Sequence, residues 1–112
     1  MSRSPPTIDE TFLKKIGALL AETAGPSRVI LFGSHARGDA EAHSDLDLLV
    51  VEPVVANRLQ ETVRLRQVLR PLRVPVDLLV CSIAEMEERR THSSGAIYWA
   101  LQEGRIIHDS LG

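Results

Sequence analysis

The chain has 112 residues, of which 44% are hydrophobic and 25% are charged, and its formal net charge is −2. This composition predicts one globular domain and excludes a disordered tail, a collagen-like repeat and a disulfide-stapled miniprotein. The charge balance disfavours a nucleic-acid partner, which requires a basic excess. No apolar run approaches the roughly 20 residues of a membrane helix. We therefore expect a cytoplasmic protein without a membrane partner, folded as a single domain over 1–112 with residues 1–6 flexible.

The apolar spacing predicts short strands alternating with helices. Thr7 to Glu10 has capping-box spacing and precedes the 3,4 rhythm of an amphipathic helix, which ends at Gly25-Pro26. The predicted strands then span 28–32, 46–51, 74–81 and 105–108, and the predicted helices span 55–70, 82–91 and 96–102. Residues 35–44 are polar and predict a loop or a single helical turn, and 93–95 interrupt two helices. This order predicts an α/β (α+β) fold, a small mixed sheet with flanking helices.

Two neighbouring segments carry residues suited to chemistry. Gly33 and Ser34 follow the first predicted strand, and Asp45 and Asp47 lie at the start of the second. Because strand side chains alternate, we expect both aspartates on one face while Leu46 and the next leucine point into the core. Two carboxylates on one face repel each other unless something compensates, and Mg²⁺ is a hard cation that prefers carboxylate oxygens.

A phosphate-binding turn and a third carboxylate would complete such a site. Glycine at position 33 permits close backbone approach, and the following amides with the Ser34 hydroxyl can donate to phosphate oxygens. Asp77 lies among apolar residues in the third predicted strand, where a carboxylate is costly to bury unless paired or metal-bound. If that strand lies beside the strand of Asp47, all three carboxylates can share a face. Such a set is the minimum for metal-assisted phosphoryl or nucleotidyl transfer.

The segment Gly33-Ser-His-Ala-Arg-Gly38, followed by Ser44-Asp-Leu-Asp-Leu48, resembles the nucleotidyltransferase signature of the DNA polymerase β superfamily. In pattern and size the chain is similar to the minimal nucleotidyltransferases (MNT), the antitoxins of HEPN/MNT toxin–antitoxin pairs. The resemblance covers nearly the whole chain, through Tyr98 to Gly104. It implies Mg²⁺, as two ions, and ATP as substrate, with AMP moved to an acceptor hydroxyl and pyrophosphate released.

The resemblance also implies roles for individual residues. By position, Asp45 and Asp47 would bind both metal ions. Asp77 would bind the catalytic metal and help to activate the acceptor hydroxyl. Gly33 and Ser34 would hold the β- and γ-phosphates. For Arg37 two roles stay open, a contact to the triphosphate or a structural ion pair.

The acceptor is expected on another chain, because larger relatives append a helical acceptor-binding domain and this sequence has no segment for one. The resemblance implies a hydroxyl of a cognate HEPN-type toxin, a tyrosine, which AMP transfer neutralises in a toxin–antitoxin hetero-oligomer. Two alternatives stay open: a non-catalytic antitoxin that occludes the toxin, and a transferase acting on a small molecule such as an aminoglycoside. Nucleic-acid polymerisation is not expected from an acidic chain without thumb- or finger-like extensions.

Other conspicuous residues have plain structural interpretations. Cys81 is expected to be a core thiol, and one cysteine cannot form an internal disulfide. Tyr98 and Trp99 are interpreted as core aromatics of an apolar helix. His35 and His43 are interpreted as solvated loop residues.

Overall fold

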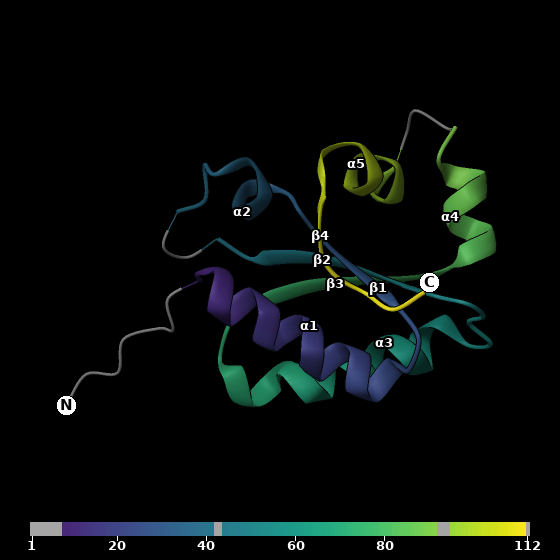
Figure 1. The fold of residues 1–112 in the computed structure, drawn as a ribbon, viewed down its shortest axis with the longest axis horizontal. Coiled ribbons are helices and arrows are strands. Elements are labelled where there is room, and N and C mark those ends of the chain that lie inside the picture. The colour runs from purple at the N-terminus through teal and green to yellow at the C-terminus, as the bar shows by residue number, and fades with distance from the viewer. Residues whose placement is uncertain (1–7, 42–43, 92–94, 112) are drawn as a thin grey trace.

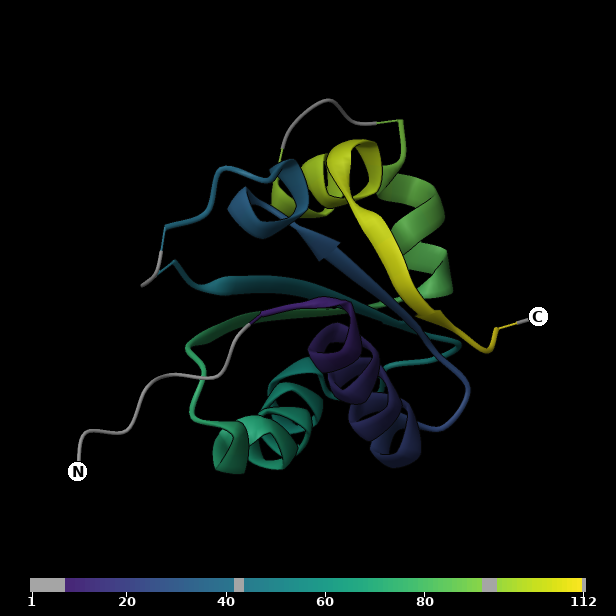
Figure 2. The same ribbon diagram turned by 60° about the vertical axis from the view of Figure 1, so that its left-hand side comes forward.

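The computed structural model contains one four-stranded mixed sheet with helices on both faces (Figures 1 and 2). The structure describes residues 8–41, 44–91 and 95–111. The strands are β1 (Arg28–Phe32), β2 (Leu46–Glu52), β3 (Val76–Ser82) and β4 (Arg105–Asp109), in the order β3-β2-β1-β4 across the sheet. β2 and β3 are parallel, whereas β1 is antiparallel to both β2 and β4. The predicted fold class is confirmed.

The helices form a layer on each side of the sheet. The lower layer in Figure 1 holds α1 (Glu10–Ala24) and α3 (Arg58–Leu69), and α3 continues into the 3-10 turn η1 (Arg70–Leu72). The upper layer holds α2 (Ser34–Arg37), α4 (Ile83–Arg89) and α5 (Ala96–Glu103). α2 is the single helical turn that the polar stretch after β1 allowed. Because α3 crosses from β2 back to the start of β3, those two strands run parallel.

Two apolar clusters, one under each helical layer, form the core. The cluster beneath α1 and α3 includes Ile16, Leu20, Leu46, Leu48, Val50 and Leu65. The cluster beneath α4 and α5 includes Ile30, Leu49, Val51, Cys81, Met86 and Ala100. β2 contributes alternate residues to both clusters, which explains why its sequence is a continuous apolar run. The core position of Cys81 is confirmed, and burial raises the pKa of its thiol to about 12.

Trp99 corrects the expectation of two core aromatics. Its side chain is 53% exposed, and it packs edge-to-face on the part-buried Tyr98 with ring centroids 5.2 Å apart. Helix α5 contacts the sheet through Ala100, with Ile97 and Leu101 beside it. Residues three and four apart share a helix face, so the position of Trp99 lies off that buried stripe.

Local signals place the helices, but some ends are shifted: α3 begins at Arg58 rather than at position 55, and α4 ends at Arg89 rather than at position 91. α1 begins after Asp9, whose side chain accepts a hydrogen bond from the Phe12 amide at 2.9 Å. The predicted cap at Thr7 was two residues too early, and Thr7 itself lies outside the described residues, as do 1–6. Gly25 ends α1 at a φ of 79°, as predicted. α4 begins at a capping box formed by Ser82 and Glu85.

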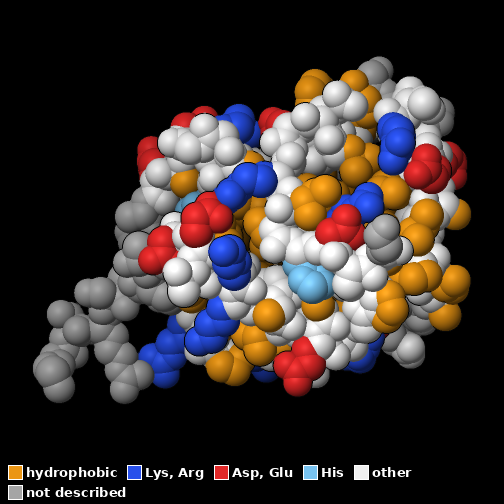
Figure 3. Space-filling view, in the orientation of Figure 1, with side chains coloured by type: hydrophobic (Ala, Val, Ile, Leu, Met, Phe, Trp, Pro, Cys, Tyr) orange, Lys and Arg blue, Asp and Glu red, His pale blue; other side chains and the backbone are white. Residues whose placement is uncertain are grey.

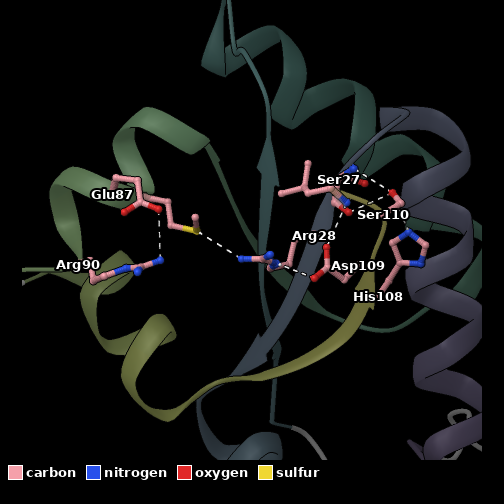
Figure 4. A network of polar contacts seen from close by, with 9 residues as sticks. Ser27, Arg28, Glu87, Arg90, His108, Asp109 and Ser110 are labelled. Carbon is pink, nitrogen blue, oxygen red and sulfur yellow. Dashed lines mark hydrogen bonds and ion pairs between the residues drawn. The ribbon is translucent and has the colours of Figure 1, made fainter.

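Polar contacts fasten β4, the sheet's outer strand, to β1. Arg28 Nε donates to Asp109 at 3.1 Å, and the Ser27 amide donates to Ser110 Oγ at 3.0 Å (Figure 4). The Ser110 hydroxyl donates in turn to the Ser27 carbonyl at 3.1 Å. These contacts join residues about 80 positions apart in the sequence, so they hold the last strand of the chain, β4, against the first strand, β1.

The surface mixes charges of both signs. Acidic and basic side chains are interspersed over the face drawn in Figure 3. This pattern differs from the single-sign field that favours nucleic acid. Within the described ranges, every helix is too short or too polar to cross a membrane.

Candidate functional site

Strand register brings two of the predicted site aspartates together. Asp47 in β2 is aligned with Asp77 in the parallel strand β3, and with Phe32 at the end of the antiparallel strand β1. The carboxyl end of β1 therefore meets the amino ends of β2 and β3, and Gly33 follows Phe32 at that edge. The candidate site is thus assembled from three adjacent strands.

Asp45 lies immediately before β2, in agreement with the predicted start of this strand at position 46. The β2–β3 ladder begins one residue later, where the Leu46 amide donates to the Pro75 carbonyl at 2.9 Å. Asp45 is exposed, and so is Asp77. The desolvation argument for Asp77 was therefore wrong, because β3 is an edge strand and its carboxylate reaches water. The register, rather than burial, places Asp77 beside Asp47.

The turn after β1 is built around Gly33. This residue has a φ of 74°, a conformation that favours glycine, and its carbonyl accepts bonds from the amides of Ala36 and Arg37 at 3.1 and 3.0 Å. A Cβ at position 33 would overlap Oδ2 of Asp47 and lie 3.0 Å from its Cγ. In the structure, the group that closely approaches Gly33 is the Asp47 carboxylate, and the approach of a phosphate to this turn stays a prediction.

The electrostatics of the site centre on Asp47. Burial of this half-buried side chain raises its pKa, and the nearby charges of Asp77 and Asp45 raise it further. Positive charge on His35 and Arg37 acts in the opposite direction. The anionic form of Asp47 is thus disfavoured in the protein alone, and a cation at this edge would favour it.

The donor set suits a hard divalent cation. Asp45, Asp47 and Asp77 offer carboxylate oxygens, the ligands that Mg²⁺ prefers. In the ranges that the structure describes, no three His, Cys, Asp or Glu side chains converge closely enough to hold a metal ion. Like charges repel, and the two exposed aspartates are turned toward water. Joint coordination by the three therefore requires side-chain rotation, which their exposure permits.

Two residues of α2 fix the loop that flanks these aspartates. Arg37 forms ion pairs with Asp39 at 3.3 Å and with Glu103 of α5 at 3.1 Å. His35 Nε2 lies 3.1 Å from the carbonyl oxygen of Ser44, to which the Nε2–H tautomer donates. His35 is half-buried, so its interpretation as a solvated residue was wrong. His43 lies outside the described residues. No local signal in the sequence links Arg37 to Glu103, which is 66 positions away.

We expect Gly33→Ala to lower the free energy of unfolding by about 1–3 kcal/mol, because the new Cβ meets Asp47 and the backbone conformation is strained. Urea denaturation measures the loss. Gly38→Ala is a matched control, since Gly38 has a φ of 83° with nothing within 4 Å of an added Cβ. The control should lose less stability. Equal losses would contradict a close approach of Asp47 to position 33.

The structure thus has aligned aspartates beside a Gly-Ser turn, on a mixed sheet with helices on both faces. This is the arrangement that the sequence led us to expect of a nucleotidyltransferase domain. The model of the nucleotidyltransferase domain family matches residues 12–98, so the chain belongs to that family. No curated protein matches the chain.

Solved structures share the fold. The chain is similar to a protein of Sulfolobus solfataricus described as a candidate nucleotidyltransferase, with a TM-score of 0.59 and 20% identity over 89% of this chain and 83% of that one. It is also similar to a chain of a toxin–antitoxin complex with AMP-PNP, with a TM-score of 0.60 and 19% identity over 91% and 74%. A third match comes from a complex of a tri-AMPylated Shewanella oneidensis HEPN toxin with its MNT antitoxin, with a TM-score of 0.58 and 17% identity over 90% and 73%.

Proposed function

We propose that this chain is an antitoxin that transfers AMP from ATP to a tyrosine hydroxyl of a cognate HEPN-type toxin and thereby neutralises it. The observation that carries the proposal is the alignment of Asp47 with Asp77 beside the Gly33 turn, in a chain of the nucleotidyltransferase domain family. The likeness to a toxin–antitoxin complex with AMP-PNP and to one with an AMPylated HEPN toxin supports ATP and a toxin acceptor.

The chemistry follows from the proposed roles of five residues. Asp45, Asp47 and Asp77 would hold the Mg²⁺ ions, which supply positive charge against the triphosphate. Ser34 and the amides after Gly33 hold the β- and γ-phosphates. The acceptor oxygen attacks the α-phosphorus, the bond between that phosphorus and the bridging oxygen breaks, and pyrophosphate leaves. The proton of the acceptor hydroxyl passes to Asp77, which orients that hydroxyl for attack.

Intact-mass spectrometry tests the proposal. The chain is co-expressed with the protein encoded beside it and supplied with Mg²⁺ and ATP. We expect the partner to gain one or more AMP units with the wild type and with the exposed control Glu41→Ala, and none with Asp45→Ala/Asp47→Ala. A stable complex that silences the partner without any mass change would favour the non-catalytic antitoxin. Transfer to an aminoglycoside without a partner protein would favour the small-molecule transferase.

Arg37 is proposed to contact the triphosphate, and Arg37→Ala separates this role from a structural one. We expect KM for ATP to rise about tenfold, the loss of one charge-assisted hydrogen bond. The free energy of unfolding should stay near the wild-type value, because the ion pairs of Arg37 are exposed. Steady-state kinetics and urea denaturation measure the two effects.

Glu103→Gln is the control for Arg37, because it removes the ion pair at 3.1 Å and leaves the guanidinium in place. Its KM for ATP should stay near the wild-type value. If Glu103→Gln raised KM as much as Arg37→Ala, Arg37 would act by fixing α2 against α5 rather than by contacting the nucleotide.

A further inference from the structure

A polar pocket lies at the end of β2 opposite to Asp47. Its volume is about 340 Å³, and it is lined by Glu52 of β2, by residues 54–57 of the following loop and by Gln60, Glu61 and Arg64 of α3. Its wall combines two carboxylates and a guanidinium with the apolar side chains of Val54, Val55 and Ala56. None of these residues belongs to the candidate site at the other end of the strand.

In its ionised form, Glu52 supplies a buried oxygen that accepts no hydrogen bond. The residue is only 6% exposed, and among the described residues its Oε2 is the buried side-chain atom left without a hydrogen bond. Glu52 shares the face of β2 that carries Leu48 and Val50, so it points toward α3. A buried carboxylate oxygen without a partner is unfavourable, and a ligand that donates to it would remove that cost.

Arg64, the nearest cation, is already engaged elsewhere. Its Nε and Nη2 donate to the two oxygens of Glu61 at 2.9 and 2.8 Å. Its Nη1 donates to the Thr23 carbonyl of α1 at 2.7 Å. All three nitrogens of this guanidinium therefore have hydrogen-bond partners other than Glu52. With both glutamates ionised, the pocket carries one uncompensated negative charge.

We propose that this pocket binds a guanidinium or ammonium group on an alkyl stem, with Glu52 as its counter-ion and the apolar loop wall around the stem. A group with one positive charge balances the pocket, and its N–H groups can donate to Oε2 of Glu52. A divalent metal ion fits less well, because it requires about six oxygen ligands and Glu61 is held by Arg64. The proposal does not depend on nucleotide transfer.

Ligand binding should be linked to proton release. Burial, a hydrogen bond from the protonated Glu52 carboxyl to Glu61 and the charge of Glu61 raise the pKa of Glu52 to about 8, while Arg64 lowers it. These are the charged groups of α3 that face Glu52, and its aligned neighbour on β3 is the uncharged Ser82. At pH 7 a cation must therefore displace a proton from Glu52. The affinity should rise about tenfold between pH 6 and pH 7, with close to one proton released at pH 7.

Isothermal titration calorimetry with n-butylguanidinium tests the proposal, in two buffers of different ionisation enthalpy that report the released proton. We expect saturable binding by the wild type and by the exposed control Glu41→Gln. Binding should weaken at least tenfold in Glu52→Gln, and neutral n-butylurea should not bind. Unchanged affinity in Glu52→Gln, equal binding of n-butylurea or no saturable binding would each overturn the proposal.

The comparison of n-butylguanidinium with n-butylurea on the wild type keeps the test valid if Glu52→Gln fails to fold, because equal binding of the neutral urea overturns the proposal. A capped Gly-Arg-Gly peptide distinguishes the source of the cation. Tighter binding of the peptide than of n-butylguanidinium supports a side chain of a protein partner. Tighter binding of n-butylguanidinium supports a free amine or guanidine.

Discussion

Asp47→Asn is expected to abolish nucleotide transfer and, at the same time, to stabilise the folded chain slightly. Loss of a carboxylate that holds the metal ions should lower kcat about a thousandfold or more, equivalent to roughly 4 kcal/mol of transition-state stabilisation. Burial and the charges of Asp77 and Asp45 raise the pKa of Asp47 in the folded state above its ordinary 3.8. Asparagine removes that unfavourable charge while keeping the shape.

The sign of the stability change follows from proton binding. Above pH 3.8, and up to the raised pKa of Asp47, the folded state holds this proton more tightly than the unfolded state does. The free energy of unfolding therefore falls as pH rises through this window, and the loss persists at pH 7. Asp47→Asn should recover it, by roughly 0.5 kcal/mol for a carboxylate that still contacts water.

Two measurements on one set of variants check this prediction. Transfer is followed by the mass of the partner, and stability by urea denaturation at pH 3.5 and pH 7. Glu41→Gln is the control, because Glu41 is exposed and outside the carboxylate set. An Asp47→Asn variant that is active, or that is destabilised at pH 7, would contradict the electrostatic account of the site.

Sequence patterns predicted the strands well because apolar runs and their breakers are local features. Gly33 ends β1, Pro53 follows β2, and the length of the helix between β2 and β3 is typical of a parallel crossover. The sequence of β2 could not show which helices cover its two faces, because those helices come from both halves of the chain. The same limit misplaced Trp99, because an apolar helix does not reveal which stripe meets the sheet.

The candidate site was predictable in composition and only partly in geometry. The alignment of Asp47 with Asp77 requires the strand order, which no spacing within a strand reveals. The exposure of Asp77 follows from the edge position of β3, and the sequence interpretation assumed burial. The burial of Glu52 depends on α3, whose Arg64 pairs with Glu61. The roles of the site residues stay predictions until variants are assayed.

Glu52→Gln is expected to stabilise the fold at alkaline pH and to have little effect at acidic pH. The pKa of Glu52 rises from 4.5 to about 8 on folding, chiefly through burial. Between these values the folded state binds more protons than the unfolded state, so the free energy of unfolding of the wild type falls as pH rises. The slope approaches about 1.4 kcal/mol per pH unit for a fully shifted group. Above pH 8 the variant should exceed the wild type by about 2–4 kcal/mol.

Urea denaturation from pH 4 to pH 9 measures this difference, with Glu41→Gln as the exposed control that should follow the wild-type curve. Parallel curves for Glu52→Gln and the wild type would show that the Glu52 carboxylate finds a solvent or protein partner on its own. At pH 8.5, n-butylguanidinium should stabilise the wild type, because the ligand binds the folded state alone. It should leave Glu52→Gln unchanged, since the amide has no charge to offer the cation. Stability and ligand binding would then report the same buried carboxylate through independent measurements.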